Sequence, residues 1–167
     1  MDKRLGWLTD PHLDFLDERK LSAFVESVAE QATEGLVMTG DIAEAQSLLP
    51  ILSRFDEVMD GPLWFVLGNH DYYGGSIESQ REQVARWSAG SRQVRWLPQC
   101  GVVSLSEQTA LVGHGGWGDG GYGDFMGSSI ILNDYRHIQD LVCSSKGLLF
   151  EKLQALGHSA ADVIEAL

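Results

Sequence analysis

Three apolar segments in the first half of the chain each end in a cluster of glycine, aspartate, asparagine or histidine. They are Leu5–Thr9 before Asp10-Pro11-His12, Leu36–Thr39 before Gly40-Asp41, and Leu63–Leu67 before Gly68-Asn69-His70-Asp71. Each pattern is typical of a buried strand with a polar loop at its carboxyl end. Apolar residues recur at helical spacing from Leu21 to Ala32, between the first two segments, and more weakly from Ile77 to Trp87, after the third. Alternating strands and helices predict an α/β layered fold with right-handed crossovers.

The polar clusters are expected to meet, because the loops beyond the carboxyl ends of parallel strands converge on one crevice. Asp10 and His12 lie two residues apart, so an extended segment would point both side chains the same way. Asp41 has two carboxylate oxygens and is therefore able to bridge two cations. Asn69 adds an amide oxygen, and His70 adds a titratable ring.

This mixture of ligands suits manganese, iron or zinc better than calcium, which prefers oxygen alone. Each motif by itself also occurs as an ordinary capped turn. The position of all three motifs at the ends of consecutive predicted strands favours a metal site over three coincidental turns.

Together, Asp10-Pro11-His12, Gly40-Asp41-Ile42-Ala43-Glu44 and Gly68-Asn69-His70-Asp71 resemble the opening motifs of the calcineurin-like metallophosphoesterases, DxH, GDxxD and GNH[DE]. The resemblance implies an αββα sandwich whose two-metal centre hydrolyses phosphoesters through a metal-bound hydroxide. It implies that Asp10 and His12 hold the first divalent ion, that Asp41 bridges, and that Asn69 binds the second. His70 would lie beside the scissile group as a general acid or transition-state stabiliser.

The chain departs from the family pattern at two points. The second aspartate of GDxxD is Glu44, which either orients His70 or is an exposed residue at a helix start. The family's later histidine and its GHxH motif have no counterpart in this sequence. His114 is the spare histidine near a predicted strand end, and a plain loop residue is the simpler interpretation. A single retained ion is therefore the alternative to two.

The second half of the chain shows a different pattern. Short strand candidates, which indicate antiparallel pairing and the start of a second sheet, lie at Val94–Leu97, Val102–Leu105 and Thr109–Gly113. Helices are predicted from Ile130 to Val142 and from about Lys146 to Leu156, with Gly157 as a stop and a restart at Ser159 that runs to Leu167.

A glycine-rich loop from Gly113 to Asp124 lies between these strands and helices. Its functional interpretation is a mobile wall that stacks a substrate on Trp117 or Tyr122. Its structural interpretation is a flexible turn between a strand and a helix. The sequence favours neither.

We expect one metallophosphoesterase-like domain over residues 1–167, a partial four-layer αββα sandwich whose second sheet is incomplete because the chain is truncated at its carboxyl end. Uncovered apolar surface and an open sheet edge would then favour a homo-oligomer or pairing with another chain.

The 24 acidic and 12 basic residues give a net charge of -12. This charge disfavours nucleic-acid binding through a basic surface and a polybasic membrane anchor. No segment approaches the roughly 20 apolar residues of a membrane helix. Cys100 and Cys143 have no disulfide or zinc-site spacing, which indicates reduced thiols in a cytoplasmic protein.

Two functions are consistent with these features. The first is a hydrolase, a phosphatase or phosphodiesterase, that acts on a phosphorylated small molecule or another phosphoester substrate. Because the protein and such a substrate are both anionic, this function requires bound cations. The alternative is a truncated or degenerate member that is not catalytic and acts as a binding or assembly module.

Overall fold

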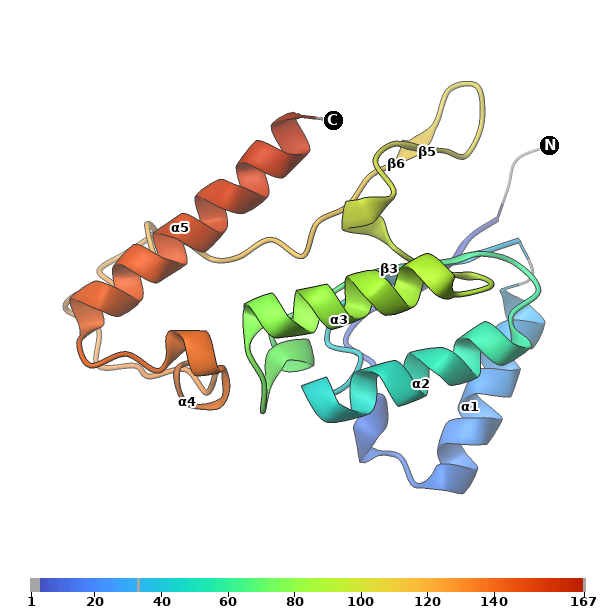
Figure 1. Cartoon of the computed structure of the whole chain (residues 1–167), viewed down its shortest axis with the longest axis horizontal. Coiled ribbons are helices and arrows are strands. Elements are labelled where there is room, and N and C mark those ends of the chain that lie inside the picture. The colour runs from blue at the N-terminus through green and yellow to red at the C-terminus, as the bar shows by residue number, and fades with distance from the viewer. Residues whose placement is uncertain (1–3, 33, 167) are drawn as a thin grey trace.

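A computed structural model, which describes residues 4–32 and 34–166, shows a parallel sheet with helices packed on one face (Figure 1). Its strands, in the order β1-β2-β3-β4, are β1 Gly6–Leu8, β2 Leu36–Thr39, β3 Leu63–Val66 and β4 Val94–Trp96. All three neighbouring pairs are parallel. In the central pair, Leu36 lies opposite Leu63 and Thr39 opposite Val66. The predicted α/β fold is confirmed.

Three helices connect consecutive strands: α1 Glu18–Gln31, α2 Ala45–Val58 and α3 Ile77–Gly90. Right-handed crossovers between strands in sequential order place all of them on the same face, and Figure 1 shows them side by side. Side-chain caps begin α1 and α3, where Asp17 accepts from the backbone N–H of Lys20 and Ser76 from that of Ser79. Short 3-10 turns follow two of the strand-end loops, η1 Leu13–Phe15 and η2 His70–Tyr72.

The main core lies between the sheet and these helices. Its largest fully buried side chains include Met38, Leu52, Phe55 and Phe65. Because β3 is central, its four residues are all buried, including those on the face away from the helices. That opposite face carries a smaller apolar cluster around Trp64, to which the following hairpin contributes.

The second sheet is a two-stranded antiparallel hairpin, β5 Val103–Ser104 and β6 Ala110–Leu111. An incomplete second sheet is thus confirmed for the described residues, but the expectation that β4 belongs to it is wrong. Strand β4 pairs in parallel with β3, because α3 returns the chain to that edge. The Ser88 hydroxyl of α3 fixes the junction, donating to the carbonyl of Val94 and accepting from the backbone N–H of Trp96.

The predicted helix from Ile130 to Val142 is wrong in extent. The structure has only α4 Asp134–His137 and a 3-10 turn, η4 Gln139–Leu141, in this stretch. Ile138 between them is extended and fully buried. The neighbouring backbone groups bond to the loop after η2 instead, with Gly74 donating to the carbonyl of His137 and Gln139 donating to the carbonyl of Gly75. Tertiary hydrogen bonds and the burial of Ile138 therefore replace a continuous helix.

Helix α5 runs without interruption over Lys146–Glu165, so the predicted stop at Gly157 is wrong; Leu167 lies outside the described residues. Gly157 allows α5 to pack closely against a loop. A Cβ atom there would lie 3.0 Å from the Cβ of Asp119, on the glycine-rich loop that crosses the helix. Figure 1 shows α4 and α5 on the side of the molecule where α2 and α3 begin, which is the carboxyl end of the parallel strands. Among the described residues, no helix has the length and apolarity needed to cross a membrane.

Candidate metal centre

Backbone hydrogen bonds hold the first two polar loops together beyond the ends of β1 and β2. The backbone N–H of Asp10 donates to the carbonyl of Gly40 at 3.2 Å, and that of His12 donates to the carbonyl of Asp41 at 3.1 Å. A third bond, 2.8 Å long, joins the N–H of Leu13 to the carbonyl of Ile42. These bonds fix the position of one loop relative to the other.

Asp71 joins the third loop to the second. Its side chain is fully buried, and Oδ1 accepts from the backbone N–H groups of Ile42 at 2.8 Å and Ala43 at 3.0 Å. Oδ2 accepts from the N–H of Gly68 at 2.8 Å. Burial raises the pKa of Asp71 to about 7, although these three donors favour the ionised carboxylate. Sequence analysis assigned no role to this residue beyond its place in the motif.

Two glycines allow the loops to approach each other closely. Gly40 has φ +87°, and a Cβ atom there would lie 2.6 Å from the backbone nitrogen of Gly68. A Cβ atom at Gly68 would overlap the carboxylate of Asp41. Neither position has room for a side chain, which explains the glycine in both motifs.

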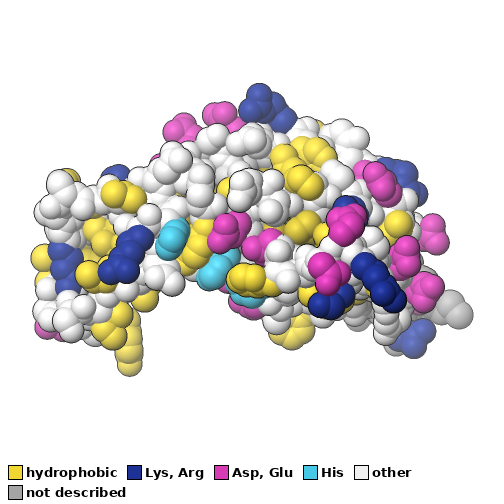
Figure 2. All heavy atoms as spheres, turned by 90° about the horizontal axis from the view of Figure 1, so that it is seen from below, with side chains coloured by type: hydrophobic (Ala, Val, Ile, Leu, Met, Phe, Trp, Pro, Cys, Tyr) yellow, Lys and Arg dark blue, Asp and Glu magenta, His cyan; other side chains and the backbone are white. Residues whose placement is uncertain are grey.

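The loops bring together a group of three side chains. His12, Asp41 and His70 each offer one ligand atom, and these atoms all lie within 4.8 Å of one another. Asp41 Oδ2 lies 4.0 Å from His12 Nε2, while Asp41 Oδ1 accepts from the backbone N–H of His70 at 3.0 Å. The two imidazole rings meet edge to face, with centroids 4.7 Å apart. Figure 2 shows histidine side chains beside acidic ones near the middle of one face of the molecule.

This donor set fits a divalent metal ion. Two imidazoles and a carboxylate are typical ligands of zinc, manganese and iron. Ligand atoms that share an ion at about 2.1 Å lie at most about 4.2 Å apart. The 4.0 Å between His12 Nε2 and Asp41 Oδ2 meets that limit and is too long for a hydrogen bond. The group as a whole extends to 4.8 Å, so its side chains must move slightly closer to share one ion. Two residues after His12, Oδ1 of Asp14 is buried without a hydrogen bond in the described part of the chain.

Backbone strain coincides with the predicted ligands. Among the described residues, the non-glycine residues with positive φ are Asp10 at 49°, His12 at 42° and Asp41 at 50°. The left-handed conformation costs an ordinary residue about 1–2 kcal/mol. Strain of this kind persists where the surrounding structure enforces it, and it concentrates at functional sites.

The remaining predicted site residues lie around this group without belonging to it. Asp10 is exposed, and its carboxylate accepts from the hydroxyl of Thr9. Glu44 is the N-cap residue of α2, and within the described residues no hydrogen bond joins its carboxylate to His70. The ligand role of Asp10 and the orienting role of Glu44 stay predictions.

Asn69 belongs to a second polar cluster with Tyr73 and Asp134. Its amide nitrogen donates to Asp134 Oδ1 at 2.8 Å, and the Tyr73 hydroxyl donates to the same oxygen at 2.6 Å. The amide oxygen of Asn69 accepts no hydrogen bond in the described part of the chain. Burial, together with the adjacent Asp134 carboxylate, raises the pKa of Tyr73. The Tyr73 ring stacks on His70, with centroids 4.2 Å apart, and so supports the metal group.

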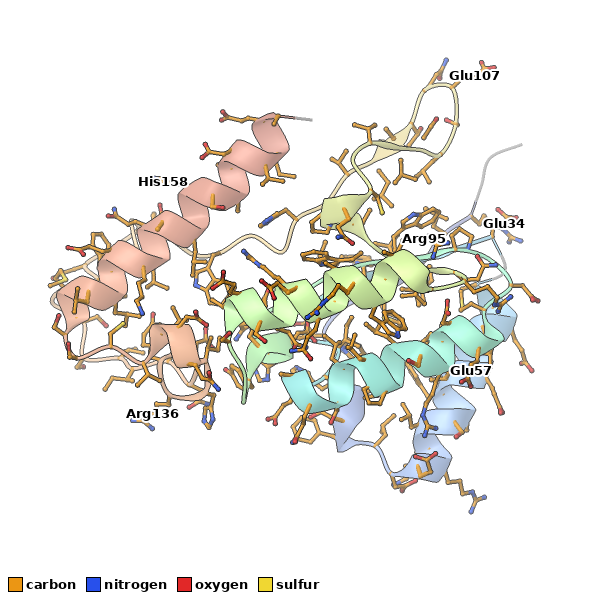
Figure 3. The ribbon with its side chains drawn as sticks, in the orientation of Figure 1. Glu34, Glu57, Arg95, Glu107, Arg136 and His158 are labelled. Atoms are coloured by element: carbon orange, nitrogen blue, oxygen red, sulfur yellow. The ribbon has the colours of Figure 1, made fainter. Side chains whose placement is uncertain are left out.

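Sequence reasoning missed Tyr73 and Asp134. Tyr73 is the second residue after the GNH[DE] motif, which is the one signal that pointed to it. Asp134 is 65 residues from Asn69 and had no such signal. His114 does not join the metal group: its Nδ1 accepts from the N–H of Gly116 at 2.9 Å, and burial, assisted by Arg81, lowers its pKa. Figure 3 shows Arg136 on α4 and His158 on α5, at the periphery of the molecule.

Comparison with known proteins identifies one family. A family model described as the calcineurin-like phosphoesterase superfamily domain matches residues 4–144. Comparisons with curated proteins and with solved structures gave no match.

Proposed function

Because the chain belongs to the calcineurin-like phosphoesterase superfamily, we propose that it hydrolyses phosphoester bonds with the help of divalent metal ions. The observation that carries the proposal is the convergence of His12, Asp41 and His70 from three strand-end loops, with ligand atoms within 4.8 Å. Family membership alone would not establish that this chain keeps a usable site. The geometry supports a site that is already formed.

The proposed roles follow the order of the loops. His12 and Asp41 hold one ion, with Asp10 completing its shell from the strained first loop. Asp41 would also bind a second ion, to which Asn69 would contribute its amide oxygen. Bound divalent ions supply two kinds of chemistry here, since they lower the pKa of a water molecule and neutralise charge on phosphoryl oxygens. Manganese, iron and zinc all suit these ligands.

His70 is the residue best placed to act on the phosphoryl group. Its backbone is fixed by Asp41, and its ring is supported by Tyr73 on one side and meets His12 on the other. We propose that the imidazole either completes the metal shell or donates a proton to the leaving oxygen. Glu44 is proposed to orient the ring once substrate and ions are present.

Charge explains why the reaction needs ions. The chain carries a formal charge of -12, and Asp10, Asp41 and Asp71 all lie in or beside the site. In the metal-free protein these groups repel a phosphoester anion. Two divalent cations reverse the local field, so that substrate binding follows metal binding. Cytoplasmic localisation and self-association stay predictions.

The test uses the full chain, stripped of metal with a chelator and then supplied with manganese, iron(II) or zinc. Hydrolysis of bis(4-nitrophenyl) phosphate and 4-nitrophenyl phosphate is followed for the wild type and for Asp41→Asn. His158→Gln, at an exposed position on α5, is the matched control. The proposal expects turnover that requires metal, is lost in Asp41→Asn and is kept in His158→Gln. Bound metal without any turnover would contradict hydrolysis and favour a binding module.

A further inference from the structure

A cavity of about 360 Å³ opens beside the metal group. Gly68 and Asn69 form part of its wall, and they directly precede His70 in the third loop. The glycine-rich loop contributes residues 115–118, and α4 contributes Asp134 and Tyr135. A group bonded to a phosphate at the metal site therefore has this cavity next to it.

The cavity carries a single kind of charge. Among the described residues that line it, Asp134 is the charged one, and neither lysine nor arginine takes part. Asp134 Oδ1 already accepts from Tyr73 and Asn69, whereas Oδ2 makes no hydrogen bond within the described chain. The lining residues thus offer an unshared anionic acceptor and no positively charged side chain to receive a negative group.

The other walls suit an organic group. Trp117 and Tyr135 provide ring surface, and the remaining wall consists of leucine side chains and glycine backbone. Trp117 is supported from behind by Tyr72, with ring centroids 5.9 Å apart. The volume falls within the range of about 300–1,000 Å³ that is usual for small-molecule sites.

We propose that this cavity receives the leaving group, and that the substrates are phosphoesters of uncharged alcohols or amino alcohols. Phosphoanhydrides and phosphorylated acids are excluded, because their leaving groups would place an anion beside Asp134. The inference rests on the proposed function. In the reaction, water forms a new P–O bond, the P–O bond to the alcohol breaks, and the leaving oxygen takes up a proton. The product in the cavity is then an uncharged or cationic alcohol.

Two variants test the negative charge of the cavity and its free volume separately. Asp134→Asn keeps an acceptor oxygen for Tyr73 and Asn69 but replaces the unshared oxygen with an N–H₂ donor. Gly118→Leu adds a side chain to the wall of the cavity, at a position where a Cβ atom meets no other atom within 4 Å and the backbone has no positive φ. Gly90→Leu is the matched control, since Gly90 at the end of α3 has equally open surroundings.

The primary measurement is binding, not turnover. Isothermal titration of the manganese-loaded full chain compares phosphocholine, glycerol 2-phosphate and 2-phosphoglycolate, with inorganic phosphate as the reference. We expect phosphocholine and glycerol 2-phosphate to bind at least about tenfold more tightly than 2-phosphoglycolate. Asp134→Asn should reduce this difference in affinity severalfold. Gly118→Leu should weaken the two favoured probes by about tenfold and leave phosphate unchanged, and Gly90→Leu should change neither.

Equal affinity for the three esters, or equal behaviour of Gly118→Leu and Gly90→Leu, would overturn the inference. Phosphate release from the same esters distinguishes this failure from failure of the proposed function. If the three esters are hydrolysed at equal rates whatever the charge of the leaving group, the proposed function is supported and the assignment of the cavity is refuted. The expected binding pattern without hydrolysis supports the cavity and refutes the function. If no probe binds at all, inorganic phosphate included, both are refuted.

Discussion

The Oδ1 atom of Asp41 accepts a hydrogen bond from the backbone N–H of His70 at 3.0 Å. The other oxygen of the same carboxylate lies 4.0 Å from Nε2 of His12. One residue therefore joins all three loops, with one oxygen used for structure and the other facing a potential fellow ligand. A site held in this way by the protein itself needs little rearrangement when an ion binds.

Asp41→Asn should remove metal binding while preserving the fold. Asparagine tolerates the left-handed conformation at this position and keeps an oxygen that accepts from His70. The negative charge and the second ligand oxygen are lost, so manganese affinity should fall by about 100-fold or more. Titration calorimetry measures the affinity, and the melting temperature of the metal-free protein should change little. Unaltered affinity would show that Asp41 is not a ligand.

Gly68→Ala should damage both stability and the site. The added methyl group would overlap the Asp41 carboxylate, so either the third loop or Asp41 must move. We expect a loss of about 2–4 kcal/mol in the free energy of unfolding, measured in urea, and weaker metal binding. Gly90→Ala has open space and should be neutral or slightly stabilising. Equal effects of the two substitutions would contradict the close packing of the loops.

Asp71→Asn should destabilise the protein although it changes few atoms. Both carboxylate oxygens accept backbone N–H bonds, from Ile42 and Ala43 at one oxygen and from Gly68 at the other. The amide N–H₂ group must face one of these donors, in a fully buried site. The expected loss is about 2–3 kcal/mol of unfolding free energy, measured by chemical denaturation without metal. A variant as stable as the wild type would mean that Asp71 does not fasten the loops.

The lowered pKa of Asp56 predicts how the stability of the protein changes in acid. Burial opposes ionisation of its carboxylate, but hydrogen bonds from Ser91 and from the backbone N–H groups of Arg92, Gln93 and Val94 prevail and lower its pKa to about 2. The ordinary pKa is 3.8, so the folded state holds this proton less tightly than the unfolded chain. The stabilisation is present above about pH 4 and disappears as the pH falls towards 2.

Asp56→Asn should therefore lower the free energy of unfolding at pH 7 by about 1 kcal/mol, a value that allows for partial solvent exposure. The difference from the wild type should vanish near pH 2. Urea titrations at several pH values measure it. Asp60→Asn is the control, because the Asp60 carboxylate makes no hydrogen bond in the described part of the chain. A difference that is independent of pH would contradict the assigned cause.

The local patterns of the first half predicted the fold and the convergence of three polar loops. Each of the first three strands is an uninterrupted apolar run with a polar end, and parallel pairing brings those ends to one edge. This is why the convergence of His12, Asp41 and His70 was accessible from sequence. The later strands were harder to assign, because β4 is only three residues long and its partner is determined by the preceding helix.

The features that sequence could not supply depend on contacts between distant segments. In the sequence, Gly157 resembles a residue that ends a helix. In the structure it leaves room for the loop residue Asp119. Ile138 interrupts a helical pattern because its burial and neighbouring tertiary bonds outweigh local propensity. Asp134 contacts Asn69, which lies 65 residues earlier in the sequence, so no local motif indicates this contact.

The most direct test of the central claim is a crystal structure of the full chain grown with manganese and measured at a wavelength where manganese scatters anomalously. We predict an anomalous peak between His12 and Asp41, within about 2.3 Å of His12 Nε2 and of a carboxylate oxygen of Asp41. Asp41→Asn crystals should lose that peak. If wild-type crystals show no peak among His12, Asp41 and His70 at saturating manganese, the three loops do not form a metal centre.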